Sequence, residues 1–139
     1  MIVNRWATLW AKYGASVALV LVLALGPQGN PWAAPARLLL LGDSLMSGYG
    51  LPPEAGFAQA LARALDKEGH PVTLIDGAVS GDTMSGGRAR LDWVLAERPS
   101  HAIVSLGGND GLRGLDPSQL ETQLDAIVGR LKKAGVAVL

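Results

Sequence analysis

The sequence of 139 residues has no cysteine, few aromatic residues and no excess of charge of either sign. Without cysteine, neither a disulfide framework nor a thiolate metal site can form. The twelve basic and twelve acidic residues are interspersed. The chain therefore has no basic block of the kind that binds a phosphate backbone, and we expect no nucleic-acid partner. A hydrophobic content of 49% with 17% charged residues predicts a globular chain.

The N-terminal region has an apolar centre at residues 15–25, which is shorter than the roughly 20 residues that a helix needs to span a bilayer. Arg5 and Lys12 precede this centre, and small residues follow it. We therefore predict a signal peptide at residues 1–36, with no defined cleavage point and with an uncleaved membrane anchor as the alternative. The remaining domain, residues 37–139, should be periplasmic or secreted and should meet a membrane only through the signal segment during export.

Beyond residue 36, apolar residues alternate between the spacing of strands and that of helices. Short apolar runs predict strands at residues 38–41, 72–75, 101–106 and 136–139. Three helices are predicted between them, with these inward-facing residues: Phe57, Leu61, Ala64 and Leu65; Leu91, Val94 and Leu95; and Leu120, Leu124, Ile127, Val128 and Leu131. Asp116 should cap the third helix. This alternation predicts an α/β fold, a flavodoxin-like three-layer α/β/α sandwich around a parallel sheet.

The last predicted strand starts only four residues before the end of the sequence. A parallel sheet that stopped there would leave its edge unpaired. We therefore expect a truncated domain that lacks its last strand.

Small and polar residues follow the first three predicted strands. They are Gly42-Asp43-Ser44, Ser80-Gly81-Asp82 and Gly107-Gly108-Asn109-Asp110. The carboxyl ends of parallel strands meet at one edge of a sheet, so we expect these segments to converge on one pocket. Ser44 offers a nucleophilic hydroxyl, and Gly81 and Asn109 offer N–H donors for an oxyanion hole. For the first segment, a tight turn capped by the serine is the alternative.

These three blocks resemble those of the SGNH, or GDSL-type, hydrolase family. Gly42-Asp43-Ser44-Leu45 matches its first block, Gly81 its second, and Gly107-Gly108-Asn109-Asp110 its third. Ser80-Gly81-Asp82-Thr83, and the run that continues from Asp110 through Gly111-Leu112-Arg113-Gly114, are similar to the exported bacterial acyl-thioesterase, lysophospholipase and arylesterase branch. Three blocks in order, each at the end of a strand, are far more specific than any one of them.

The resemblance implies a role for each matching residue. Ser44 would be the catalytic nucleophile, and its own N–H, that of Gly81 and the Asn109 amide would form the oxyanion hole. Asp43 and Asp110 would either support the pocket or only cap local turns. A loop over the acyl group would consist of Gly111, Leu112, Arg113, Gly114 and Leu115.

The sequence departs from the family in its histidines. The family supplies the base that activates the serine from an Asp-x-x-His block near the C-terminus, and this sequence has only His70 and His101, both before Asn109. Each should lie at the amino end of a strand, across the sheet from Ser44, as a surface or turn residue. We therefore expect the base and its Asp partner to be missing from this chain, and the chain itself to be an inactive fragment.

The predicted function is that of a serine esterase that hydrolyses small-molecule acyl esters or thioesters. The alternatives are a carbohydrate acetylesterase of the same fold and a non-catalytic α/β module that binds an anion or small ligand. No cofactor and no metal are expected, because two carboxylates and two remote histidines make no recognisable metal site. Arg88, Arg90 and Arg98 should form a solvated helix face. The sequence carries no prediction of oligomeric state.

Overall fold

A computed structural model describes residues 34–139, so the predicted signal segment lies almost wholly outside the described residues. Four parallel strands form one sheet in the order β2-β1-β3-β4. The strands are β1 (Ala36–Gly42), β2 (Val72–Asp76), β3 (His101–Ser105) and β4 (Ala137–Val138). The predicted α/β fold is confirmed. In the described part of the chain, no helix is both long and apolar enough to cross a membrane.

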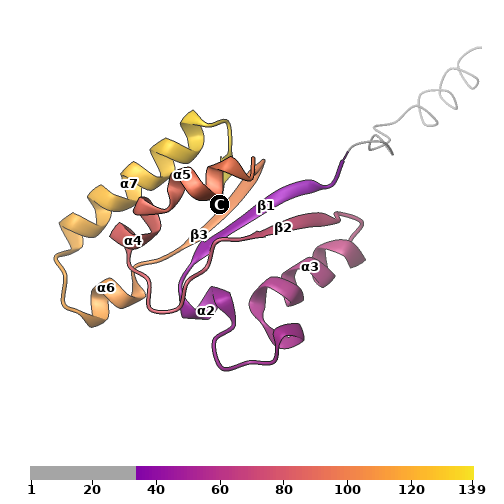
Figure 1. The fold of residues 1–139 in the computed structure, drawn as a ribbon, viewed down its shortest axis with the longest axis horizontal. Coiled ribbons are helices and arrows are strands. Elements are labelled where there is room, and N and C mark those ends of the chain that lie inside the picture. Colours follow the sequence, from indigo (N-terminus) through magenta and orange to yellow (C-terminus); the bar gives the residue numbers. More distant parts are fainter. Residues whose placement is uncertain (1–33) are drawn as a thin grey trace, which may run out of the picture. The chain divides into compact units, whose positions relative to one another are not determined.

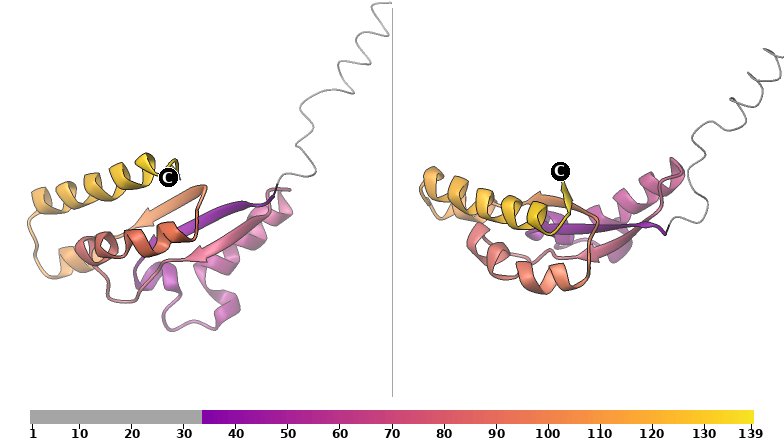
Figure 2. Two further views of the ribbon diagram at one scale, coloured as in Figure 1. Left: turned by 45° about the horizontal axis from the view of Figure 1, so that its top comes forward. Right: turned by 90° about the horizontal axis from the view of Figure 1, so that it is seen from above.

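The helices cover both faces of this sheet (Figure 1). They are α2 (Ser44–Ser47), the 3₁₀ turn η1 (Pro53–Ala55), α3 (Phe57–Lys67), α4 (Met84–Ala89), α5 (Leu91–Ala96), α6 (Gly108–Leu112) and α7 (Pro117–Lys133). Figure 2 shows α7 and α3 on opposite sides of the strands. The arrangement is the predicted three-layer α/β/α sandwich.

The two layers of core follow from the alternation of side chains along β1. Leu39 and Leu41 are fully buried on one face against α4, α5 and α7, in a cluster with Val94, Ile127 and Leu131. Leu38 and Leu40 point to the other face, against α2 and α3. Because both faces are covered, an uninterrupted run of leucines suits this strand. Full burial of each such side chain stabilises the fold by roughly 1.5–3 kcal/mol.

Helix α3 packs less deeply than its periodicity predicts. None of its residues is fully buried, and Phe57 is 43% exposed. The residues that contact the core are Ala58, Leu61 and Leu65, so the predicted inward positions of Phe57 and Ala64 are wrong. The cause is a small rotation of the apolar stripe toward Ala58, since Ala58 lies one position after Phe57 and follows the same helical spacing to Leu61 and Leu65.

Helix α7 begins as predicted. The Asp116 side chain accepts hydrogen bonds from the backbone N–H of Ser118 at 2.8 Å and from its hydroxyl at 2.7 Å. Both bonds lower the pKa of Asp116 below its usual value, and the bond from the Ser118 hydroxyl has the larger effect. Ile127 and Leu131 of α7 are fully buried. Leu124, also predicted to face inward, is instead 37% exposed near the middle of the helix.

Candidate active site

The segment after β1 turns at once into the short helix α2. A Cβ on Gly42 would lie 2.6 Å from the Cβ of Met46, so only glycine fits at this turn. Asp43 is buried, and its carboxylate accepts a hydrogen bond from the N–H of Leu45 at 3.0 Å, which caps α2. Ser44 is half-buried, and its Oγ has no hydrogen-bond partner among the residues that the structure describes. The hydroxyl is thus free to contact a ligand.

The segment after β2 runs beside the end of β1 and then turns at Gly81. The N–H of Val79 donates to the carbonyl of Gly42 at 3.0 Å, and the N–H of Asp82 donates to the carbonyl of Val79 at 3.1 Å. Gly81 lies within this turn with a φ of 81°, a left-handed conformation that favours glycine. Gly81 is exposed, and within residues 34–139 its N–H donates to no acceptor. Nothing lies within 4 Å of a Cβ built on Gly81, so this amide is accessible.

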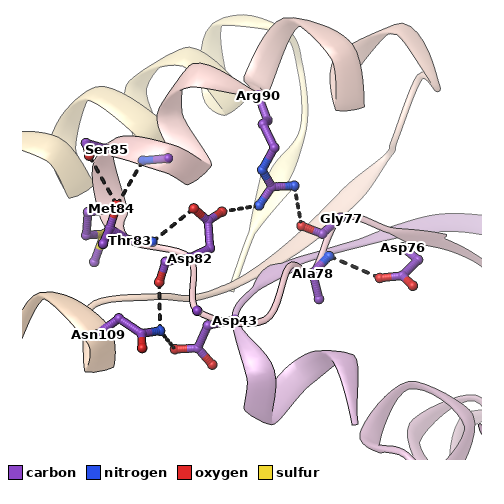
Figure 3. Close-up of polar contacts among 12 residues, drawn as sticks. Asp43, Asp76, Gly77, Ala78, Asp82, Thr83, Met84, Ser85, Arg90 and Asn109 are labelled. Carbon is purple, nitrogen blue, oxygen red and sulfur yellow. Dashed lines mark hydrogen bonds and ion pairs between the residues drawn. The ribbon is translucent and has the colours of Figure 1, made fainter. Parts of the chain in front are cut away.

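The segment after β3 joins the other two through one side chain. Asn109, on α6, donates from Nδ2 to the carbonyl oxygen of Asp82 at 2.8 Å and to the Asp43 carboxylate at 3.4 Å (Figure 3). Asp43 adjoins Ser44, and Asp82 adjoins Gly81, so these bonds bring the three predicted segments together at the carboxyl edge of the sheet. The convergence expected from the topology is confirmed.

A second bond fixes α6 against the start of α4. The Asp110 side chain is only 2% exposed, and its carboxylate accepts a hydrogen bond from the N–H of Met84 at 2.9 Å. Asp110 therefore links two segments of the site, whereas Asp43 both caps α2 and contacts Asn109. Asp43 thus caps a local turn, which was one of the two predicted roles, and both aspartates also bond to another of the three segments.

Both hydrogens of the Asn109 amide face acceptors in this structure, because a –NH₂ group has two donors and Asn109 makes two contacts. The contact with Asp43 is the longer one. A ligand oxygen that binds to Asn109 would have to replace it, while the 2.8 Å bond to Asp82 holds the side chain in place. The bond to Asp82 would thus orient the Asn109 amide, while the hydrogen that now faces Asp43 could be donated to a ligand.

Arg90 lies at this site, and the prediction that it belongs to a solvated helix face is wrong. It sits between α4 and α5, and its guanidinium donates to the carbonyl of Gly77 at 2.8 Å and pairs with the Asp82 carboxylate. Arg88, on the same helical turn, is exposed and donates to Gln123 of α7. The chain turns inward at Arg90 because one helix ends and another begins there, and no local spacing in the sequence signals that break.

The segment predicted as a loop over an acyl group, residues 111–115, is a loop only in part, because Gly111 and Leu112 are the last two residues of α6. All five of its residues are exposed, and Leu112 is 89% exposed. Arg113 donates from its guanidinium to the carbonyl of Gly81 at 3.2 Å, which joins this loop to the second segment. Gly114 has a φ of 67°. In the part of the chain that the structure describes, no cluster of three or more His, Cys, Asp or Glu could hold a metal ion.

Both histidines lie far from Ser44. His101 is the first residue of β3, and His70 precedes β2, so both are at the amino edge of the parallel sheet while Ser44 follows the carboxyl end of β1. His101 contacts the hydroxyl of its neighbour Ser100 through Nδ1 at 2.9 Å. Their predicted position across the sheet from the serine is confirmed.

Comparison with known proteins agrees with this geometry. The GDSL-like lipase/acylhydrolase family matches residues 40–139. The chain is 40% identical over 108 residues to "Esterase TesA" of Pseudomonas aeruginosa, covering 77% of this chain and 54% of that protein. It is also 40% identical over 108 residues to "Thioesterase 1/protease 1/lysophospholipase L1" of Escherichia coli, covering 77% of this chain and 50% of that protein. The chain thus spans about half the length of these curated relatives.

A solved structure shows the same fold. The crystal structure of AlinE4, an SGNH-hydrolase family esterase, superposes with a TM-score of 0.73 at 37% identity, covering 76% of this chain and 58% of that one. The chain therefore belongs to the GDSL-like lipase/acylhydrolase family. The predicted family is confirmed.

Proposed function

We propose that residues 37–139 carry the nucleophile and the oxyanion hole of a serine esterase that hydrolyses acyl esters or thioesters. The observation that carries this proposal is the convergence of the Ser44, Gly81 and Asn109 segments, joined through the Asn109 amide. Family membership supports it, as do relatives named esterase and thioesterase. Since the chain spans about half the length of those relatives, the activity of the whole protein is itself part of the proposal.

The proposed reaction passes through an acyl-enzyme on Ser44. The serine Oγ attacks the carbonyl carbon of the ester as its proton moves to a general base, and the carbonyl oxygen becomes an oxyanion. The backbone N–H groups of Ser44 and Gly81 and the side-chain amide of Asn109 donate to that oxygen. The base returns the proton to the leaving alcohol or thiol. Water then attacks the acyl-serine by the same steps and releases the acid.

Three further groups of residues have supporting roles in this proposal. Asp43 orients Ser44 by capping α2, and Asp110 holds α6 against α4. The exposed segment of residues 111–115, the end of α6 and the loop after it, would contact the acyl group, since Arg113 binds the carbonyl of Gly81. A small-molecule ester or thioester is the proposed partner, and the mechanism calls for no cofactor.

The general base is the part of the mechanism that the described residues do not supply beside Ser44. Both histidines of the sequence lie at the opposite edge of the sheet. We therefore propose that a histidine outside this sequence acts as the base. The 139-residue chain alone should then retain only the weak catalysis that an oxyanion hole supplies without its triad. Ester hydrolysis by the purified chain at an ordinary enzyme rate would contradict this point.

A non-catalytic binding module is the second candidate, and the absence of a histidine beside Ser44 within residues 34–139 favours it. The same free hydroxyl and free amide could then hold an anion or a small ligand without reacting with it.

Reaction with a fluorophosphonate distinguishes the two candidates, provided that it is measured on the complete product of the gene. An esterase is labelled stably, and Ser44→Ala abolishes the labelling. Ser100→Ala is the matched control, because the Ser100 hydroxyl already contacts a histidine at 2.9 Å but lies at the other edge of the sheet. A folded protein that is not labelled, or whose labelling survives Ser44→Ala, would eliminate the esterase proposal.

Export is a separate proposal that rests on the sequence alone. Residues 1–36 would direct the chain across a membrane, and the domain would act outside the cytoplasm. The mass of the protein recovered from the expressing cells tests this, since removal of the signal leaves a chain that begins near residue 37. Recovery of only the uncut chain, in the membrane fraction, would favour the anchor.

A further inference from the structure

The arginine between α4 and α5 differs from the other arginines that form ion pairs within residues 34–139. The Arg90 side chain is 23% exposed and that of its partner Asp82 is 12% exposed, whereas Arg130 and its partner Asp92 are 48% and 84% exposed. Exposed pairs contribute little, because water and salt screen them. A pair shielded from water is held more firmly and fixes the groups that it joins. Arg90 is thus placed to order a loop.

Each group that Arg90 contacts belongs to the segment that carries Gly81. One guanidinium nitrogen donates to the carbonyl of Gly77, where this segment leaves β2, and another pairs with the carboxylate of Asp82, where the turn closes (Figure 3). The fork of the guanidinium therefore spans the segment from its first residue to the residue after Gly81. No lysine could make both contacts in this planar geometry.

The contacts continue from Asp82 to the second proposed donor. The Asp82 carboxylate accepts from the N–H of Thr83 at 3.0 Å, and its main-chain carbonyl accepts from the Asn109 amide at 2.8 Å. Asp82 also follows Gly81 directly, so the contacts of Arg90 with Gly77 and Asp82 hold both ends of the turn that carries the Gly81 N–H. A single residue thus connects Arg90 to both Gly81 and Asn109.

The orientation of Arg90 has a cost. Its Nε is buried and has no hydrogen-bond partner in the described part of the chain. A buried donor without a partner is unfavourable, and such a group calls for an explanation. The explanation here is geometric, because turning the guanidinium so that its two terminal nitrogens reach Gly77 and Asp82 leaves Nε facing protein.

We propose that Arg90 is a positioning residue for the oxyanion hole, which sets the Gly81 N–H and the Asn109 amide through Asp82. This inference rests on the proposed function, in which those two groups donate to the oxyanion. Arg90 would touch no substrate atom. It would act only by holding the donors where an oxyanion forms.

Nuclear magnetic resonance of the ¹⁵N-labelled 139-residue chain tests the positioning without any need for activity. In Arg90→Lys, the backbone amide signal of Gly81 and the side-chain amide signals of Asn109 should shift, and their hydrogen exchange should become faster. The signals of α7 should stay in place. Arg88→Lys is the matched control, because Arg88 lies two residues earlier, is exposed and bonds to Gln123 of α7 rather than to the site, so it should leave Gly81 and Asn109 unchanged.

A second variant covers the case in which Arg90→Lys does not fold. Asp82→Asn keeps the shape of the side chain but removes its charge, and the same Gly81 and Asn109 signals should move. The proposal is overturned if these signals stay in place in a folded variant, or if Arg88→Lys moves them equally. If neither Arg90→Lys nor Asp82→Asn folds, the pair is required for folding and the positioning role is likewise rejected.

The rate of fluorophosphonate labelling at Ser44 in the complete gene product adds a functional readout. Misplacement of a catalytic group by about 1 Å can lower a rate about 10²-fold, and Arg90→Lys should slow labelling by about that factor. Arg88→Lys should label at the normal rate. Labelling of Arg90→Lys at the normal rate would contradict the proposal. Absence of labelling in the unsubstituted protein would count against the esterase, and the Gly81 and Asn109 signals would then decide the role of Arg90 by themselves.

Discussion

The two edges of the sheet each hold a serine among polar residues, but the two serine hydroxyls differ in the contacts that they make. At the carboxyl edge, hydrogen bonds join residues of separate segments, as Asn109 does with Asp43 and Asp82. At the amino edge, Ser100 and His101 are exposed neighbours in the sequence, and the hydroxyl contacts the histidine Nδ1 at 2.9 Å.

The difference shows that a serine beside a histidine is not in itself a catalytic arrangement. The Ser100 Oγ also accepts a hydrogen bond from the backbone N–H of Arg37 at 3.0 Å, so this hydroxyl is engaged in holding β1 to the start of β3. Ser44 has no histidine, but it has a free hydroxyl and lies beside donors that other segments hold in place. Preorganised donors distinguish a candidate site from a surface contact.

The largest effect should come from the donor at the carboxyl edge. In the complete gene product, Asn109→Ala should lower kcat for ester hydrolysis about 10²–10³-fold, or about 2.7–4 kcal/mol of transition-state stabilisation, because one oxyanion donor is lost. His101→Gln, at the amino edge, should leave kcat unchanged. Steady-state kinetics with a nitrophenyl ester measures both. A lower kcat for His101→Gln than for Asn109→Ala would contradict the assignment of the active site to the carboxyl edge.

A smaller effect, on stability, should follow removal of the buried carboxylate of Asp110. Asp110→Ala leaves the N–H of Met84 without its partner and should lower the free energy of unfolding by about 1–3 kcal/mol. Urea unfolding of the 139-residue chain gives this value. A loss below the error of that measurement would show that water replaces the carboxylate and that this edge is less tightly built than its burial indicates.

A still smaller change in the free energy of unfolding is expected at the exposed ion pair of the amino edge. Arg37 and Glu97 approach to 3.3 Å with side chains 41% and 59% exposed. Glu97→Gln should lower the free energy of unfolding by about 0.2–1 kcal/mol, and high salt should reduce the difference between the variants. If Glu97→Gln lowers the free energy of unfolding as much as Asp110→Ala does in the same urea titration, the carboxyl edge is not the more tightly bonded of the two.

The smallest effect concerns pH and the cap of α7. The two bonds from Ser118 lower the pKa of Asp116 in the folded chain, so the ionised cap stabilises the fold at pH values above the pKa of the unfolded state. That contribution is lost as the pH falls through the lowered pKa of the folded state. Thermal unfolding between about pH 6 and about pH 2 should show a smaller acid-induced decrease of the melting temperature for Asp116→Asn than for the original chain. Equal decreases would mean that other carboxylates account for the acid sensitivity.

Much of this fold could be predicted from local patterns. The leucine run of β1, the cap at Asp116 and the order of strands and helices depend on neighbouring residues, and the structure confirms them. Parallel topology then brings Ser44, Gly81 and Asn109 to one edge without further information. The exposure of Phe57 was missed because a rotation of a helix by one position changes which residues face the core while leaving its period intact.

The polar contacts of the site were harder to predict. Arg90 reaches a carbonyl thirteen residues earlier and a carboxylate eight residues earlier, and both contacts depend on how the end of β2 and α4 lie beside each other in the fold. From sequence alone, Arg88 and Arg90 look alike, since both are arginines in a helical pattern. Tertiary packing decides which of them turns inward.

The bonds that join the three segments end largely on the main chain. The acceptors of Arg90 and Asn109 include the carbonyls of Gly77 and Asp82, and the donor to Asp110 is the N–H of Met84. Every residue type has a carbonyl, and every type except proline has an N–H. The bond to Asp110 therefore does not depend on the side chain at position 84, and another apolar residue that fills the same buried space in the core could keep it in a diverging sequence.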